Sequence, residues 1–324
     1  MLSKWLSVSF FAPEKFTDET IESLKTELTD KAILAASGGV DSTIAAVLAS
    51  RAVGDNLLAI YVDTGYMRLN ESEFVSSMLE DLGVKHKVID ASKQFYEGLQ
   101  GVTDPEHKRQ IIGELFIRVF EEEARKYGGK ILVQGTIAPD WIESGGGMRD
   151  TIKSHHNVGG LPEDMEMKLC EPIRELYKDE VRSLAEYLEV SVAHRQPFPG
   201  PGLAVRVMGE ATPKRAEIVR QACHIVENEL ESAANDGKME LPWQYFAVLL
   251  PVKTVGVQGD VRAYSNTIAV RAVQSYDAMT AQALDIPHSV LRKISERITR
   301  ELKSDVNRVV YDITDKPPGT IEWE

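Results

Sequence analysis

Seven consecutive residues near the start of the chain have the composition of a phosphate-binding loop. They read Ser-Gly-Gly-Val-Asp-Ser-Thr and lie between a short apolar run and a stretch with helical periodicity. Two adjacent glycines allow a sharp turn and a close approach of the backbone to a ligand, and the start of a helix offers unpaired N–H groups. Hydroxyl side chains add further donors. We therefore predict that phosphate binds to Ser37, Gly38, Gly39, Val40, Asp41, Ser42 and Thr43.

The carboxylate of Asp41 distinguishes this loop from the familiar mononucleotide loop, which ends in Gly-Lys-Ser or Gly-Lys-Thr. A carboxylate beside phosphate is repulsive unless a cation lies between them. The loop therefore predicts Mg²⁺, with Asp41 as its ligand. A simpler interpretation is a glycine turn that opens a helix with Ser37 as its cap, but the complete heptapeptide favours phosphate binding.

Alternating strands and helices must position this loop. Short apolar runs predict buried strands, and segments with helical spacing separate them. Such repeated units indicate an α/β fold, with a parallel twisted sheet covered by helices on both faces. We expect strands at 31–36, 57–62, 85–90 and 131–134, and helices at 40–53 and 105–127. A further helix is expected between an N-cap at Asn70 and a stop at Gly83.

Two further segments join the candidate site because ligands bind beyond the carboxyl ends of parallel strands. Asp63, Thr64 and Gly65 follow the second strand, and Gly135 and Thr136 follow the fourth. Backbone N–H and C=O groups at these points can hydrogen-bond adenine without the help of charged side chains. For Asp63, a role as a cap of a loop or helix is an equally good interpretation.

The segment 195–202 (RQPFPGPG) interrupts the alternation with three prolines and two glycines. We place a domain boundary there, with one domain at 1–196 and a second at 197–324. The second part has strand-like runs without intervening helices, which indicates a small α+β domain. Helices are expected at 213–234 and 287–302, and strands at 245–250, 267–273 and 308–312.

Bulk properties exclude several classes of protein. The 324-residue chain carries a formal net charge of −13, so we expect no binding to nucleic acid. It has no apolar run long enough to span a bilayer and no signal-peptide pattern, so we expect a cytoplasmic protein without a membrane role. Two distant cysteines, Cys170 and Cys223, argue against a disulfide framework and favour buried small side chains.

The heptapeptide resembles the pyrophosphate loop of the N-type ATP pyrophosphatases, which cleave ATP between the α and β phosphates and adenylate a substrate oxygen. Further segments resemble the GMP synthase family, and most closely its separate synthetase subunit. They span nearly the whole chain in order, at 134–144, 152–162, 171–182, 196–209, 255–264 and 307–324.

The resemblance implies a reaction, a cofactor and partners. ATP would activate xanthosine monophosphate through an adenylated intermediate with release of pyrophosphate and AMP, and ammonia would complete GMP. Mg²⁺ would accompany ATP. Cys170 and Cys223 lie in no glutaminase-like setting, so ammonia would come from a separate glutamine amidotransferase subunit. The C-terminal domain would pair two subunits into a homodimer.

The same resemblance assigns roles to individual residues. Lys153 would neutralise phosphate charge beside Asp41 as a catalytic residue. His155 and His156 are adjacent, which is poor spacing for a shared metal, and their roles stay open. The loop 137–171 is a candidate lid. Cations and the last residues of the chain are candidates for binding the substrate nucleotide: Arg206, Arg262, Arg271, Lys316, Thr320, Ile321, Glu322, Trp323 and Glu324. Among these, Lys316 and the run 320–322 are favoured.

Three alternatives remain. An amidating enzyme similar to NAD synthetase would share the loop but leave the Pro-Gly-Pro-Gly link and the KPPGTIEWE ending unexplained. A tRNA-thiolating enzyme would need reactive cysteines and a basic face. A catalytically silent nucleotide-binding regulator of a glutaminase would bind ATP without releasing pyrophosphate.

Overall fold

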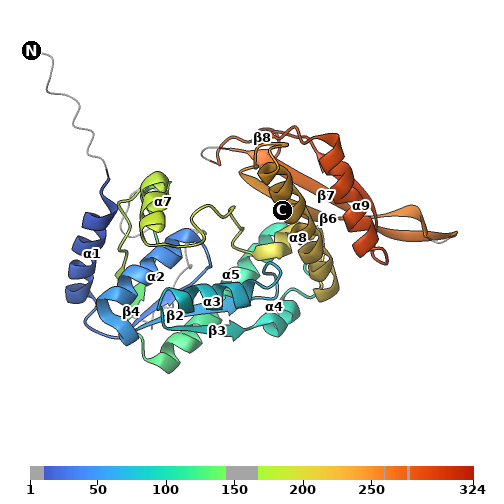
Figure 1. Ribbon diagram of the computed structural model, residues 1–324. Coiled ribbons are helices and arrows are strands. Elements are labelled where there is room, and N and C mark those ends of the chain that lie inside the picture. The colour runs from blue at the N-terminus through green and yellow to red at the C-terminus, as the bar shows by residue number, and fades with distance from the viewer. Residues whose placement is uncertain (1–10, 144–166, 259, 276–277) are drawn as a thin grey trace, which may run out of the picture. The chain divides into compact units, whose positions relative to one another are not determined.

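The computed structural model describes residues 11–143, 167–258, 260–275 and 278–324. The chain divides into two compact units, which we treat separately (Figure 1). The first comprises residues up to 62 together with 72–89 and 117–195, and the second comprises 63–71, 90–116 and 196–324. The division at 196/197 inferred from the proline-rich link remains a prediction.

A five-stranded sheet organises the N-terminal half of the chain, in the order β3-β2-β1-β4-β5. The pairs β1–β2, β1–β4 and β4–β5 are parallel. Hydrogen bonds from Ala59 to Lys85 and from Ala91 to Asp63 advance in the same direction, so β3 is parallel to β2 as well. The strands are β1 (Ala32–Ala35), β2 (Leu57–Asp63), β3 (His86–Asp90), β4 (Ile131–Val133) and β5 (Lys168–Cys170).

The strand order reverses at β1, because β2 and β3 continue on one side of it and β4 and β5 on the other. In parallel sheets, a ligand site forms where the order reverses. The loops that leave β1 and β4 therefore flank the switch point. This topology confirms the predicted α/β fold class.

Helices connect the strands. Right-handed crossovers place α2 and α3 on one face of the sheet and the C-terminal half of α5 on the other. Helices α1, α2 and α7 pack against one another. The bounds are α1 (Pro13–Glu27), α2 (Val40–Val53), α3 (Glu71–Asp81), α4 (Ser92–Gly98), α5 (Pro105–Tyr127), α6 (Ala138–Glu143) and α7 (Lys178–Tyr187), with a 3₁₀ turn at Gly54–Asn56.

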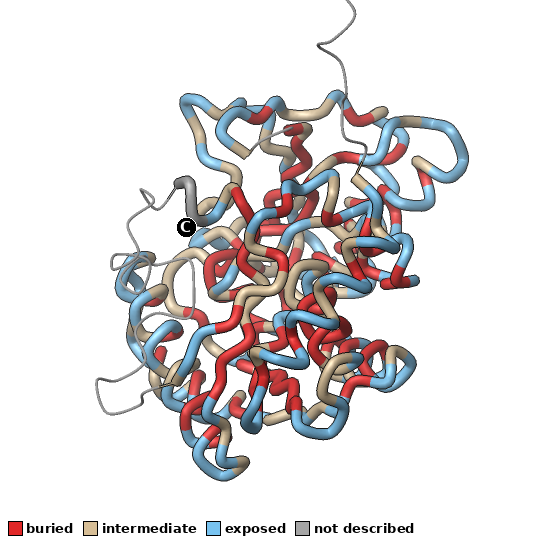
Figure 2. The backbone as a smooth tube through the Cα atoms, turned by 90° about the vertical axis from the view of Figure 1, so that its left-hand side faces the viewer, coloured by how far each residue is buried: buried red, intermediate tan, exposed pale blue. Residues whose placement is uncertain are grey.

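The core of this half forms because the central elements are almost entirely apolar. Residues 32–34 and 57–62 are buried, and so are residues 43–49 of α2 (Figure 2). The alanines among them let α2 approach the sheet closely, since side chains of this size need little room. The position of the phosphate loop, at the start of α2, is therefore fixed by tightly packed structure.

A second sheet organises the C-terminal part. Strands β6 (Gln244–Gln258) and β7 (Val261–Gln274) form a long antiparallel hairpin with a register shift between Leu249 and Lys253. Strand β9 (Val306–Asp312) runs parallel to β7, and the short β8 (Gln282–Ala283) pairs with the end of β7. This arrangement confirms the expected α+β character.

Two amphipathic helices accompany the second sheet. Helix α8 (Pro213–Asn235) packs on β6, and α9 (His288–Glu301) packs on α8 and β9. Thr212 caps α8 by accepting a hydrogen bond from the Arg215 amide, and Pro213 occupies its first turn. A 3₁₀ segment, Gly202–Arg206, follows the proline-rich link. None of the described helices is long and apolar enough to cross a membrane.

Candidate active site

The predicted phosphate loop leaves β1 and enters α2. Gly38 has a φ of +76°, which suits glycine, and Gly39 is the N-cap residue of α2. Ser37 is therefore not the cap that the simpler interpretation proposed. The Ser37 hydroxyl instead lies 2.9 Å from that of Ser42, and Thr43 donates to the Gly39 carbonyl at 2.8 Å.

The first turn of α2 keeps its anion-binding capacity. Gly39 has no side chain with which to cap the helix. Among the backbone N–H groups of the described residues, the Ser37 hydroxyl accepts only from that of Gly39, at 3.3 Å, so the N–H groups of the first helical turn are available to a ligand. The positive end of the helix dipole adds to the attraction for phosphate. The serine hydroxyls organise the loop, and the backbone supplies the binding surface.

Gly135 and Thr136 leave β4 next to this turn. A Cβ on Gly135 would lie 2.7 Å from the carbonyl carbon of Asp41 and 2.8 Å from the Ser42 nitrogen, so only glycine fits there. The Thr136 side chain is 1% exposed, and its hydroxyl has no hydrogen-bond partner among the described residues. Buried hydroxyls are rarely left unpaired, which is consistent with the prediction that Thr136 contacts a ligand.

Asp41 occupies an unusual electrostatic position. Burial and the neighbouring carboxylate of Asp140 raise its pKa to about 6, and Lys178 acts in the opposite direction. Asp140 accepts a hydrogen bond from the Ile137 amide at 3.0 Å. Two neighbouring carboxylates favour a divalent cation, because its charge offsets their repulsion.

Asp140 and Lys178 are residues that sequence reasoning missed. Both lie inside segments that carried the family resemblance, 134–144 and 171–182, but nothing in their spacing singled them out. Asp140 lies in α6, which follows β4, and Lys178 is the first residue of α7. Both come near Asp41 because β4 and α7 pack against α2. Lys153, His155 and His156 lie outside the described residues, as does most of the candidate lid at 137–171.

The loop after β2 belongs to the second compact unit. Asp63 accepts a hydrogen bond from the Gly65 amide at 2.8 Å, and the Thr64 hydroxyl accepts one from Tyr66 at 3.3 Å. Gly65 has a φ of +77°. The carboxylate of Asp63 thus caps its own turn, as the second of the two sequence interpretations describes. Its part in reading adenine remains a prediction.

Arg220 of α8 holds this loop in place. Its guanidinium donates to the carbonyls of Met67, at 3.0 Å, and of Gly65. The Tyr96 hydroxyl also donates to the Gly65 carbonyl, at 2.7 Å. The Leu203 amide donates to the Tyr66 carbonyl at 2.7 Å. The loop is therefore fixed by α8 and by the segment that follows the proline-rich link.

In the same unit, the structure pairs two of the predicted substrate residues with each other. Arg206 is 1% exposed and donates two hydrogen bonds to Glu322, at 2.8 and 3.1 Å. Gln244 donates a third at 2.9 Å, and the Phe246 ring lies 4.1 Å from the guanidinium carbon. The buried Arg206 therefore fixes the orientation of the Glu322 carboxylate.

Arg271 organises the rest of the final segment. It is fully buried, donates to the carbonyls of Thr314 and Thr320, and pairs with Asp312 at 3.1 Å. Lys316 donates to the Ala278 carbonyl at 2.8 Å. The chain from 312 to 322 is thus held by the buried cations Arg206 and Arg271, of which Arg271 bonds the carbonyls of Thr320 and Ile321.

Arg262 does not join this group within one chain. It lies at the exposed end of the β6–β7 hairpin, opposite Val257. Arg271 is nine positions further along the same strand, which corresponds to about 30 Å at ~3.4 Å per residue.

Both cysteines are buried free thiols. Burial raises the pKa of Cys170 to about 12 and also raises that of Cys223. A nucleophilic cysteine needs the opposite shift, so neither residue has the environment of a glutaminase nucleophile.

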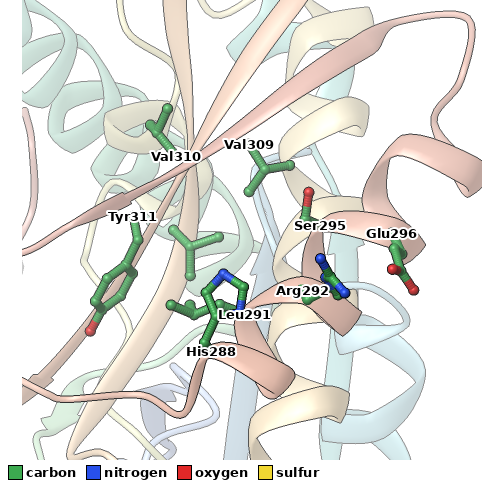
Figure 3. Close-up of a pocket in the computed structure, with 9 residues that line it drawn as sticks. His288, Leu291, Arg292, Ser295, Glu296, Val309, Val310 and Tyr311 are labelled. Atoms are coloured by element: carbon green, nitrogen blue, oxygen red, sulfur yellow. The ribbon is translucent and has the colours of Figure 1, made fainter.

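The second unit also contains a pocket (Figure 3). It is formed by α9 and β9 with Val270, and its sides include Leu291, Arg292 and Tyr311. It shares no residue with the predicted site.

The parallel sheet and a Gly-Gly loop with aspartate in place of lysine define the class of the N-type ATP pyrophosphatases, or PP-loop proteins. The family model described as NAD synthase matches residues 14–116, and that described as GMP synthase C terminal domain matches residues 229–323.

Similar proteins extend this assignment over the whole chain. The protein from Pyrococcus abyssi is 57% identical over 315 residues, covering 96% of this chain and 99% of the relative. That from Pyrococcus furiosus is 55% identical over 327 residues, covering 100% of both, and that from Methanocaldococcus jannaschii is 55% identical over 318 residues, covering 97% and 100%. Each bears the name of one subunit of a glutamine-hydrolyzing GMP synthase. The chain belongs to this family of enzyme subunits.

Two solved structures resemble it at lower identity. The NH3-dependent NAD synthetase from Campylobacter jejuni, in complex with a nitrate ion, is 17% identical with a TM-score of 0.43, covering 56% of this chain and 75% of that one. The NMN synthetase from Francisella tularensis is 18% identical with a TM-score of 0.46, covering 71% and 88%.

Proposed function

We propose that this chain is the ATP pyrophosphatase subunit of GMP synthase and that it converts xanthosine monophosphate to GMP. Its membership of the GMP synthase subunit family supports this proposal. The observation that carries it in the structure is the start of α2, where Gly38 and Gly39 leave helix N–H groups without a side-chain cap at the sheet's switch point. Such a site suits the pyrophosphate released from ATP.

The chemistry follows from the poor leaving group at carbon 2 of xanthine. The oxygen on that carbon attacks the α-phosphorus of ATP, and pyrophosphate departs into the loop. Ammonia then adds to carbon 2, the carbon–oxygen bond breaks, and AMP leaves with that oxygen. The chain's contribution is positioning and charge stabilisation, and no side chain acts as a nucleophile.

Asp41 is the residue that we propose as the Mg²⁺ ligand. A carboxylate that is partly buried beside Asp140 suits a hard divalent cation. When bound, Mg²⁺ would neutralise charge on the phosphate oxygens. Lys178 is a described cation near Asp41, and we propose that it and Lys153 stabilise the departing pyrophosphate.

For the nucleotide substrate we propose the final segment of the chain, through Lys316, Thr320, Ile321 and Glu322. Three anchors support this placement: Arg206 on Glu322, Arg271 on the segment's carbonyls and Lys316 on Ala278. Arg206 is too buried for direct contact, so it acts by orienting Glu322.

We further propose a homodimer through the C-terminal sheet, with the hairpin as part of the interface. Its far end exposes large apolar side chains, including Val257 at 75%, Val261 at 67% and Tyr264 at 69%. Exposure of this extent indicates a surface that a partner covers. The partner would meet Arg262 at the same end of the hairpin.

Ammonia would come from a glutamine amidotransferase subunit, since the relatives' name denotes one subunit of a glutamine-hydrolyzing enzyme. The two buried thiols are consistent with the absence of a second nucleophilic site in the described residues. We also propose a cytoplasmic location, because both cysteines are unpaired, as is usual in reducing compartments.

The test is a defined assay. The purified chain is mixed with Mg-ATP, xanthosine monophosphate and ammonium salt, and the nucleotides are separated. Matched formation of GMP and AMP supports the proposal, and glutamine should replace ammonium only after a glutaminase subunit is added. AMP formed only with nicotinic acid adenine dinucleotide as the acceptor would favour the NAD synthetase alternative. Binding of ATP without cleavage would favour the regulator.

A further inference from the structure

Lys108 is a fully buried lysine in the first turn of α5, inside the second compact unit. Its ammonium group donates to the Val207 carbonyl at 2.8 Å, to the Ala204 carbonyl at 3.3 Å and to the carboxylate of Glu324. All three bonding directions of the ammonium are therefore used. None of these contacts belongs to the phosphate loop or to its chemistry.

Glu324, the partner of Lys108, is also buried and fully hydrogen-bonded. Its side chain is 2% exposed, and its second carboxylate oxygen accepts a hydrogen bond from the Gly209 amide at 2.9 Å. Arg109, the next residue of α5, donates to the main-chain oxygen of Glu324. Lys108, Arg109 and Gly209 together fix both the side chain and the backbone of this residue.

The contacts of Lys108 and Arg109 attach the final segment to α5 as well. Residues 312–322 are held mostly by the second sheet, through Arg271 and Gln244, and by Arg206. Glu322, held by Arg206, lies only two positions before Glu324, held by α5. A shift of Glu324 would thus be transmitted directly to the Glu322 carboxylate.

The energetics argue for a role beyond stability. Burying an ammonium–carboxylate pair costs desolvation that its attraction only roughly repays, and apolar residues of similar size often hold a fold as well. Desolvation indeed lowers the pKa of Lys108, while Glu324 opposes that shift. In some proteins, what such a pair adds over apolar packing is a fixed position for the groups it joins.

We propose that Lys108 is a positioning residue for the nucleotide substrate: by fixing Glu324 it sets the placement of the segment 316–324 and hence of the Glu322 carboxylate. This inference rests on the proposed role of that segment in binding xanthosine monophosphate. Lys108 itself touches no substrate. Its removal should weaken the binding of xanthosine monophosphate and leave the binding of ATP unchanged.

The test compares the full chain with the variants Lys108→Met and Glu324→Gln. Hydrogen exchange in the peptide 313–324 should become at least about tenfold faster in both variants, because a lost buried charge pair permits local opening. In ammonia-dependent GMP synthesis, the KM for xanthosine monophosphate should rise about tenfold, while kcat and the KM for ATP stay within about threefold of the original values.

Lys293→Met is the matched control. Lys293 also pairs with a buried glutamate, Glu229, at 2.7 Å in the same compact unit, although its own side chain is 61% exposed. Among the described residues, its ion pair involves no residue of 312–324. Lys293→Met should leave both the hydrogen exchange in 313–324 and the KM for xanthosine monophosphate unchanged, whatever its effect on the melting temperature.

Two results would overturn the inference: unchanged exchange in 313–324 after Lys108→Met, or a rise in the KM for ATP equal to that for xanthosine monophosphate. If the original chain forms no GMP, the proposed function fails independently. The exchange comparison then still decides the anchor, with faster exchange in support and unchanged exchange against it.

Discussion

Gly135 and Asp41 meet through their main chains: a Cβ on Gly135 would lie 2.7 Å from the carbonyl carbon of Asp41. The exit of β4 thereby abuts the first turn of α2, whose N–H groups form the proposed pyrophosphate site. Because both partners are backbone, neither can move aside as a flexible side chain would.

Gly135→Ala should therefore disturb the loop directly. We expect a loss of about 1–3 kcal/mol in the free energy of unfolding and about a hundredfold loss in kcat/KM for ATP, from overpacking and a misplaced phosphate site. Urea unfolding and steady-state kinetics measure the two effects. Gly113→Ala is the control, because nothing lies within 4 Å of its added methyl group in helix α5. It should stabilise the chain by about 0.5–1 kcal/mol with activity retained.

Asp41→Asn should separate stability from function. The pKa of Asp41 is raised from 3.8 to about 6 by burial and Asp140, so the charged form is unfavourable in the folded protein. The folded state binds the proton more tightly than the unfolded state, and this stabilisation is lost as pH rises through 6. Without metal or nucleotide, Asp41→Asn should be more stable than the original chain at pH 7.5, by about 1–3 kcal/mol, and the difference should vanish below about pH 4.

The same variant should lose Mg-dependent ATP cleavage at pH 7.5. Urea unfolding at several pH values and release of pyrophosphate are the measurements. A variant that is less stable at pH 7.5 and fully active would contradict both the electrostatic account and the assignment of Asp41 as the metal ligand.

Arg206→Met should leave Glu322 as a largely buried, unbalanced charge. Removing one partner of such a pair costs about 3–5 kcal/mol. Binding of xanthosine monophosphate should weaken at the same time, because Glu322 loses the two bonds that orient it. Urea unfolding and isothermal titration test this expectation. A change below about 1 kcal/mol in stability would show that the pair is dispensable.

Arg220→Met should loosen the loop after β2, since the guanidinium bonds two of its carbonyls. We expect the KM for ATP to rise about tenfold with the KM for xanthosine monophosphate unchanged. The neighbouring Gln221→Ala removes a hydrogen bond to Glu217, which also pairs with Arg220, but keeps the Arg220 guanidinium that bonds the loop, so it serves as the control. Equal changes in both KM values would argue against a specific role of this loop in ATP binding.

The regular elements of the chain were largely predictable because their patterns are local. The helix expected at 105–127 is α5 with the same bounds, and the runs at 57–62 and 131–134 are β2 and β4 within one residue at either end. Helices α1, α4, α6 and α7 and strands β5 and β8 were not predicted. Strand β5 spans three residues, two of them exposed, so it has no apolar run to reveal it.

The long hairpin was underestimated for a related reason. The strands predicted at 245–250 and 267–273 extend to Gln244–Gln258 and Val261–Gln274. Their additional residues are mostly exposed and carry a glycine and two charges, Lys253 and Arg262, so burial does not mark them. A turn with Gly-Asp at 259–260 is a hairpin signal that sequence analysis could have used.

The site divides in the same way. Ser37–Thr43 were predictable because the whole motif is contiguous in sequence. Lys178, Arg220 and Lys108 were not, because each acts on a segment far away in the chain and only packing of α7, α8 or α5 brings it there. Glu324 lies in the final run of residues that the sequence singled out, but its pairing with Lys108 was not predictable.

Transfer of oxygen tests the central claim most directly. Xanthosine monophosphate labelled with ¹⁸O on carbon 2 is incubated with the chain, Mg-ATP and ammonium, and the products are analysed by mass spectrometry. The account predicts one ¹⁸O in each AMP formed with GMP, and none in pyrophosphate, because that oxygen attacks the α-phosphorus. Label found in inorganic phosphate together with ADP, or released into water, would contradict it.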